Sequence, residues 1–199
     1  MNISEVLQNQ LSPQVIEQLA NQIGVSDPAQ VQAASSGIIS TLLAALNKNT
    51  GTPSGLNAFV SALDRDHDGS ILNDIMGFVT GSSQPSNTSA SNGSGILGHI
   101  LGGLQPNVLD MISRISGIDK AKVGQLAITI APLLLGWLGK QRQEGGLNVG
   151  GIGTLLKQSA QTVAHQPQTS LINKFLDRNG DGSVIDDIAR MGMDIFLKK

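Results

Sequence analysis

The chain has 199 residues, of which 14% are charged, and its 13 basic and 15 acidic side chains nearly cancel. A usual share of charged residues is about 25%, and the balance of signs excludes the basic footprint of a nucleic-acid-binding protein. Aromatic residues make up 3%, which removes the stacking surfaces that single-stranded nucleic acids and sugars require. The absence of cysteine excludes disulfides, thiol nucleophiles and thiolate metal sites.

The first residues, MNISEVLQNQLSPQ, predict an amphipathic helix. They lack a basic segment followed by a continuous apolar stretch, so we expect no secretory signal there. On this ground we expect a cytoplasmic protein, with export without a cleavable signal as the alternative.

Apolar residues recur at intervals of three and four along the chain, and this periodicity predicts an all-helical fold. Gly24 and Gly117 predict helix ends. Three helix starts are marked by a capping side chain followed by proline at the first helical position, at Ser12-Pro13, Asp27-Pro28 and Thr52-Pro53.

The most hydrophobic run, residues 123–139, contains 17 uncharged residues. As a helix it spans about 25 Å, the lower edge of what a bilayer crossing requires. Gln125 and Pro132 lie inside the run, and we favour a buried core helix over a membrane span.

The two halves of the chain repeat each other. Residues 11–31 align with residues 104–123, and the long apolar helix continues the match from Ile38 on Ile130 to Lys48 on Lys140, a constant offset of 92. The acidic segments that follow are offset by 113, since 177 minus 64 is 113, so the second copy contains about 21 extra residues. A further helix is expected there, around residues 152–164.

These boundaries predict a first helical repeat over residues 1–80 and a second over residues 96–199. Residues 81–95, GSSQPSNTSASNGSG, have the composition of a flexible linker. We favour one pseudo-symmetric body in which the two apolar helices are buried side by side at the centre, with two loosely joined domains as the rival.

Each repeat ends in an acidic loop that resembles an EF-hand calcium loop. Such loops aim alternate oxygens at one point, and a glycine at position 6 permits the sharp bend. We predict two weak Ca²⁺ sites, at residues 64–75 and 177–188. The candidate ligands of the first site are Asp64, Asp66, Asp68, Ser70 and Asp74. The candidate ligands of the second site are Asp177, Asn179, Asp181, Ser183 and Asp187.

The loops depart from an EF-hand at position 12, where isoleucine replaces the bidentate glutamate and aspartate stands one place earlier. We therefore expect dissociation constants on the order of 10⁻⁴ M or weaker. Helix capping is the competing interpretation, because Ser183 with Asp186 forms a capping box and acidic residues suit the first turn of a helix. Capping does not require the aspartates upstream, so we favour ion binding, and both roles are compatible.

Other motifs carry less weight. The string at residues 66–70, DHDGS, matches the nucleophile motif of aspartyl-phosphate phosphatases, but that chemistry requires a preceding strand. The glycines near residue 150 match neither phosphate-loop spacing. His67, His99 and His165 lie far apart without partner motifs, and no catalytic set can be assembled.

Three strings resemble the bacterial domain of unknown function 937 family, related to YidB-like proteins: GILGHILG at 95–102, IAPLLLGWLGKQ at 130–141 and LDRNGDGSVIDDI at 176–188. They cover the second half, and the first half resembles a diverged copy. The resemblance implies a multihelical fold with buried central helices and no assigned activity.

From these observations we expect a non-enzymatic calcium-binding helical protein, an interaction or scaffold module that binds an unknown protein or itself. A membrane-active or self-assembling exported protein is the second hypothesis, and an uncharacterised enzyme is the third.

Overall fold

A computed structural model describes residues 11–83 and 88–165 of the chain, and every regular element within these ranges is helical. The prediction of an all-helical fold is therefore confirmed. The α-helices are α2 (Pro13–Ile23), α3 (Pro28–Asn49), α4 (Pro53–Asp66), α5 (Ile75–Thr80), α6 (Gly93–Leu101), α7 (Gln105–Ser116), α8 (Lys120–Gln143) and α9 (Val149–His165). Two short 3-10 helices, η1 (Ser70–Asp74) and η2 (Gly102–Leu104), lie between them.

The helix boundaries follow from capping chemistry. Three helices start where a hydroxyl or carboxylate accepts a hydrogen bond from a backbone N–H of the first turn, at Ser12, Asp27 and Thr52. Gly24 and Gly117 end α2 and α7 in the left-handed region, with φ of 65° and 73°. These sequence predictions are confirmed.

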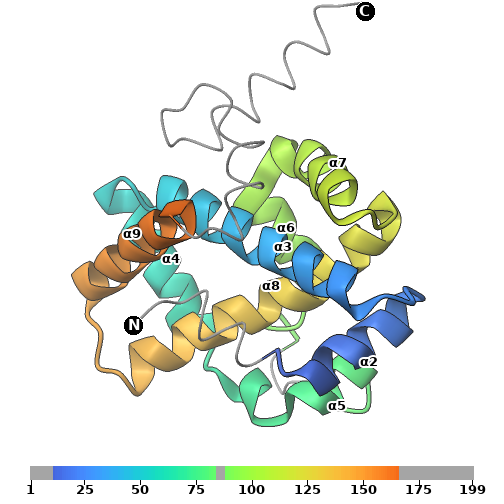
Figure 1. Ribbon diagram of the computed structural model, residues 1–199. Coiled ribbons are helices and arrows are strands. Elements are labelled where there is room, and N and C mark those ends of the chain that lie inside the picture. The colour runs from blue at the N-terminus through green and yellow to red at the C-terminus, as the bar shows by residue number, and fades with distance from the viewer. Residues whose placement is uncertain (1–10, 84–87, 166–199) are drawn as a thin grey trace, which may run out of the picture.

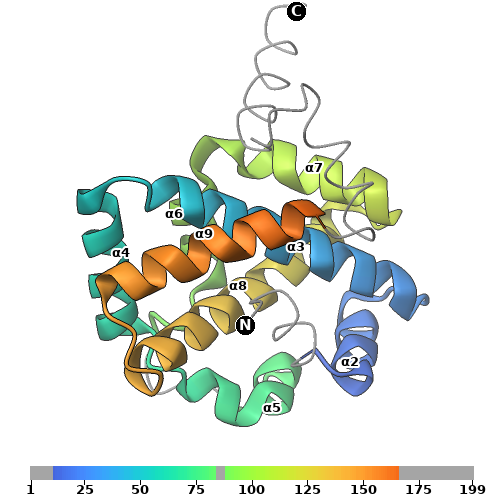
Figure 2. The same cartoon turned by 60° about the vertical axis from the view of Figure 1, so that its left-hand side comes forward.

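The two long apolar helices, α3 and α8, contact each other at the centre of the molecule (Figures 1 and 2). Helices α2, α6, α7 and α9 each pack against α3, and α2, α4, α6 and α7 pack against α8. Buried side chains from both halves of the chain form one hydrophobic core. Its largest fully buried members include Leu42 and Leu46 of α3 and Leu134 and Leu138 of α8.

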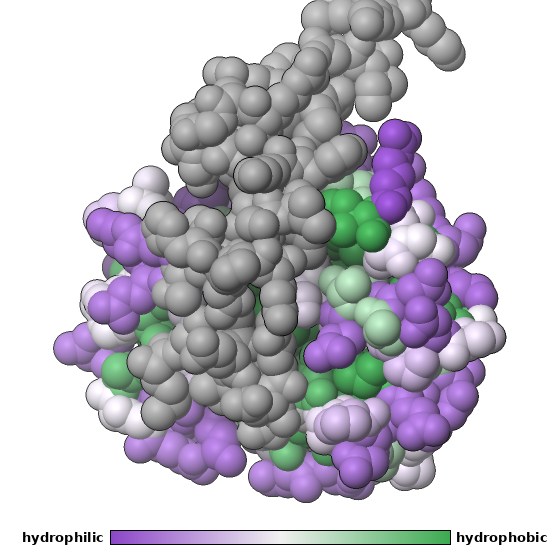
Figure 3. Space-filling view, in the orientation of Figure 1, coloured by the Kyte–Doolittle hydropathy of each residue, from purple (hydrophilic) through white to green (hydrophobic). Residues whose placement is uncertain are grey.

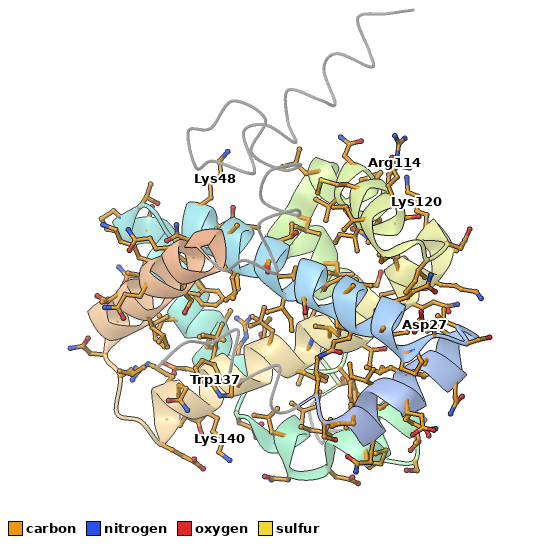
Figure 4. All side chains as sticks on the ribbon, in the orientation of Figure 1. Asp27, Lys48, Arg114, Lys120, Trp137 and Lys140 are labelled. Carbon is orange, nitrogen blue, oxygen red and sulfur yellow. The ribbon has the colours of Figure 1, made fainter. Side chains whose placement is uncertain are left out.

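Both central helices are long and apolar enough to cross a membrane by length and composition, and 67% of the apolar window of each is buried inside the fold. Trp137 of α8 is 3% exposed (Figure 4). The large hydrophobic residues exposed in the described part of the chain are Met76 and Ile128. On the face seen in Figure 3, small apolar patches lie between polar and charged residues.

The segment between the repeats is partly structured. Helix α6 begins at Gly93, so its first three residues lie in the range predicted as a linker, and Ala90 is 3% exposed. A Cβ atom at Gly93 would overlap the carbonyl oxygen of Ile128, so glycine permits α6 to start directly against α8. The further helix expected around residues 152–164 is α9, which packs on α3 and α4.

Candidate functional site

The acidic loop at residues 64–75 is a sharp bend between two helices. Helix α4 continues through Asp66 and ends at His67, whose N–H donates to the Leu63 carbonyl at 3.0 Å. Gly69 follows at φ 83°, a conformation that favours glycine, and the chain then forms the 3-10 helix η1. This glycine is at position 6 of the predicted loop, so the prediction of the bend is confirmed.

The loop lies directly on the central helix α8. A Cβ atom at Gly139 would overlap the backbone carbonyl of His67, and one at Gly136 would overlap the side chain of Ile71. A Cβ atom at Gly69 would lie 2.8 Å from the Lys140 Cβ, so the backbones of loop and helix are in close contact. The Lys140 side chain projects from this stretch of α8 (Figure 4). The position of the loop therefore depends on the absence of side chains on one helix face.

The first pair of aspartates in the loop pairs with arginines. Asp64 lies 3.3 Å from the Arg142 guanidinium at the end of α8, and Asp66 lies 2.7 Å from the guanidinium of its neighbour Arg65. The two residues are still helical, and positions i and i+2 of a helix do not face each other. The regular helix therefore directs the two carboxylates apart.

The second pair of aspartates accepts hydrogen bonds from nearby backbone N–H groups, and Asp74 is the N-cap of α5. Asp68 accepts a hydrogen bond from the Ser70 N–H at 2.9 Å, and Asp74 accepts one from the Gly77 N–H at 2.7 Å at the start of α5. Asp74 therefore caps α5, and the predicted capping box of Ser183 with Asp186 lies outside the described residues.

The predicted ligands of the first site do not converge in this conformation. Within residues 11–83 and 88–165, no group of three histidine, cysteine, aspartate or glutamate side chains is arranged to hold a metal ion. The arrangement described does not fit one hard cation, and calcium binding at residues 64–75 stays a prediction. The second candidate site lies outside the described residues, with its ligands Asp177, Asn179, Asp181, Ser183 and Asp187.

The electrostatics of the loop follow from these contacts. Hydrogen bonds from the Ser70 hydroxyl and N–H lower the pKa of Asp68. The hydrogen bond to Asp66, with the charge of that carboxylate, raises the pKa of Arg65. His67 is 7% exposed and burial lowers its pKa, an effect that the charges of Asp66 and Asp68 oppose. Its Nδ1 atom has no hydrogen-bond partner among the residues that the structure describes.

Sequence reasoning missed two features of this region. The first is Arg142, which donates to the Leu147 carbonyl at 2.9 Å and to Asp64, and so joins the end of α8 to the following loop and to α4. The second is that Gly136 and Gly139 form the surface of α8 on which the loop packs. Their spacing of three residues on an otherwise bulky helix was the available signal, because glycine inside a helix requires a compensating reason.

The fold and the loop define an all-helical protein in which two buried apolar helices form the centre and an acidic bend lies on one of them. The chain matches, over residues 5–141, the model of a family described as bacterial protein of unknown function (DUF937), and it belongs to this family. No curated protein and no solved structure matches the chain.

The matched range contains two of the three strings that suggested the family and excludes the third. The strings at 95–102 and 130–141 lie within it, as does nearly all of the first repeat with its acidic loop. The string at 176–188 lies beyond it. The family model therefore spans the first half of the chain and nearly all of both central helices, α3 and α8.

Proposed function

We propose that the chain is a non-enzymatic helical protein that binds calcium weakly at residues 64–75 and presents its helical body as an interaction or scaffold module. The observation that carries the proposal is the concentration of four aspartates on one bend, with glycine at the left-handed position and the bend seated on the core helix α8. If the loop rearranges so that these carboxylates come together, they repel one another, and a divalent cation offsets that repulsion.

Ion binding requires a local rearrangement of the loop. Asp64 and Asp66 must leave the last turn of α4, and their pairs with Arg142 and Arg65 must open. Those pairs are at the surface, where an ion pair contributes about 0–1 kcal/mol. Opening the terminal turn of a helix has a similarly small free-energy cost, so the rearrangement opposes calcium binding only weakly.

A thermal scan of the full chain tests this proposal. At a Ca²⁺ concentration of about 100 times the dissociation constant, binding to the folded state alone stabilises by about 2.7 kcal/mol per site. The melting temperature should therefore be higher with Ca²⁺ than with Mg²⁺ or with a chelator. Three superimposable curves would remove calcium from the proposal.

Single substitutions assign any shift to a loop. Asp68→Ala should remove the contribution of the first loop, and Asp181→Ala that of the second. Asp110→Ala is the matched control, because Asp110 is an exposed residue of α7 whose partner is Arg114. A calcium response that survives both loop substitutions together would place the ion elsewhere on the chain.

We also propose that the fold is a pseudo-symmetric duplication with two EF-hand-like loops. The support is local: α2 and α7 both end at a left-handed glycine, and α3 and α8 both start after an aspartate that caps the second helical residue. The capping aspartates are Asp27 and Asp119, which are aligned in the sequence repeat. An experimental structure in which the two repeats do not superpose would contradict this.

Membrane association is the second candidate, favoured by the length and composition of α3 and α8. It requires these helices to leave the core in which two thirds of each window is buried. Flotation with liposomes, with and without Ca²⁺, separates the two candidates, since a chain that stays at the bottom of the gradient in both conditions is not membrane-active.

A further inference from the structure

Helix α6 is a short helix that covers part of both central helices. It has nine residues and packs on α8 and α3. Its large buried side chains are Ile96, Leu97, Ile100 and Leu101. An isolated helix shorter than about 12–15 residues is marginal in water. Packing therefore holds α6 in its helical form, and the segment would unfold on leaving the central helices.

The composition of α6 weakens it further. Three of its nine residues are glycine, and glycine inside a helix is less favourable than alanine because it loses more conformational freedom. Gly98 lies inside the helix on its exposed side, and no heavy atom lies within 4 Å of the place of a Cβ atom there. No close contact in the described part of the chain thus requires glycine at this position. Helix α7, which packs on the same two central helices, contains no glycine.

The start of α6 rests on an irregular point of α8. Pro132 lies inside α8 and has no N–H, so the Ile128 carbonyl lacks the donor that an α-helix normally supplies four residues along. Gly93, the first residue of α6, lies against this carbonyl, and a Cβ atom on Gly93 would overlap its oxygen. The hydrogen that glycine carries in place of the Cβ atom points at the oxygen, which is the arrangement of a weak Cα–H···O hydrogen bond. Pro132 and Gly93 together therefore fix where α6 begins on α8.

The other end of α6 is a glycine joint. Gly102 follows the helix with φ 54° and ψ −134°, a conformation that favours glycine. No heavy atom lies within 4 Å of a Cβ position at Gly102 or Gly103, so a change of backbone direction there meets no close neighbour on that side. The Asn49 amide of α3 donates to the Ile100 carbonyl at 3.0 Å, and this hydrogen bond joins the last turn of α6 to the end of α3.

We propose that α6 is a strap that opens by local unfolding, with Gly102 as its hinge, while the central helices and α7 stay packed. Opening breaks the contact of Gly93 with the Ile128 carbonyl and the hydrogen bond from Asn49, and it frees the backbone of a glycine-rich segment. It also uncovers the apolar surface of α3 and α8 beneath α6. The strap therefore controls access to the central helices. It involves neither acidic loop, so it is tested separately from calcium binding.

Native-state hydrogen exchange of the full chain measures the opening, because an amide exchanges through the least costly opening that exposes it. After correction for intrinsic rates, the amides of residues 97–101 in α6 should exchange at least tenfold faster than the slowest amides of α7 and α8. Equal rates in the three helices would show that α6 opens only when the whole fold does, which overturns the proposal.

Two alanine substitutions separate local from global opening. Gly98→Ala favours the helical form of α6 and should slow exchange in α6 about fivefold. Gly124→Ala is a substitution in α8, where a Cβ atom would meet only the Leu109 Cδ1 at 3.6 Å. It should slow the slowest amides of α8 about two- to fivefold and leave exchange in α6 unchanged. If Gly124→Ala slows exchange in α6 as much as in α8, the strap does not open on its own.

Gly93→Ala tests the point at which α6 is anchored. The added Cβ atom overlaps a backbone carbonyl of α8, so the start of α6 must move away from that helix. Overpacking of this kind should make exchange in α6 at least about fivefold faster. Ser94→Ala is the matched control at the next residue, which is exposed, and it should leave the rate within about twofold. An unchanged rate in Gly93→Ala would show that α6 is not anchored at Ile128, which contradicts the proposal.

Discussion

Two glycine-to-alanine substitutions in the same helix should have opposite effects on stability. Gly139 and Gly124 both lie inside α8. A Cβ atom at Gly124 would meet only the Leu109 Cδ1 at 3.6 Å, an ordinary contact. A Cβ atom at Gly139 would overlap the backbone carbonyl of His67, which cannot rotate away.

The magnitudes follow from this geometry. Alanine is favoured over glycine inside a helix by about 1 kcal/mol, so Gly124→Ala should stabilise the fold by roughly 0.5–1 kcal/mol. At Gly139 the same gain is opposed by overpacking, which costs about 1–3 kcal/mol, and by partial loss of the burial of Ile71 when the loop is displaced. The expected net effect is a loss of about 1–2 kcal/mol. For a chain of this length it corresponds to a fall in melting temperature of about 2–8 °C.

Thermal and urea denaturation of the two variants beside the parent chain measure the difference. If Gly139→Ala stabilises the fold as much as Gly124→Ala, the acidic loop is not seated on α8. The reasoning about this contact between loop and helix then fails.

Two further predictions concern the surroundings of the loop. Arg142→Ala should lower the free energy of unfolding, measured in urea, by about 1 kcal/mol, because its guanidinium group is 29% exposed and bonds both Asp64 and the Leu147 carbonyl. The control Arg114→Ala removes a more exposed ion pair and should cost less than about 0.5 kcal/mol. Equal losses would show that the contacts of Arg142 contribute no more than an exposed surface ion pair. For His67, burial lowers the pKa in the folded state, so the unfolded chain takes up the proton first: stability is complete above the unfolded pKa of about 6.5 and falls as the pH drops below it. A pH series of melting temperatures should show this decline in the parent and a smaller one in His67→Gln. Parallel curves would show that the lowered pKa of His67 does not contribute to the decline.

Much of the local structure was accessible from the sequence because its causes are local. A hydroxyl or carboxylate before the first turn fixes a helix start, as at Asp27, and a glycine in the left-handed region fixes an end, as at Gly24. The bend at Gly69 was predicted for the same reason. The family resemblance, which rests on the string around residues 130–141 among others, was also confirmed.

The candidate site was less accessible because it depends on where side chains point. Alternating aspartates suggested one ion, but they converge only if the chain leaves the helix before Asp64. Instead α4 continues through Asp66, the carboxylates diverge, and Arg142 reaches Asp64 from 78 residues away in the sequence. The local sequence specifies neither the residue at which α4 ends nor an ion-pair partner 78 residues away.

The sequence by itself determined the helical periodicity, the caps and the bend, since each depends on neighbours within a few residues. Only the tertiary structure decided that the two apolar helices share one core and that the acidic bend at residues 64–75 lies on the central helix α8. The physical reason is that these contacts depend on close packing between distant segments, where one missing Cβ atom at Gly139 determines how near a loop can approach.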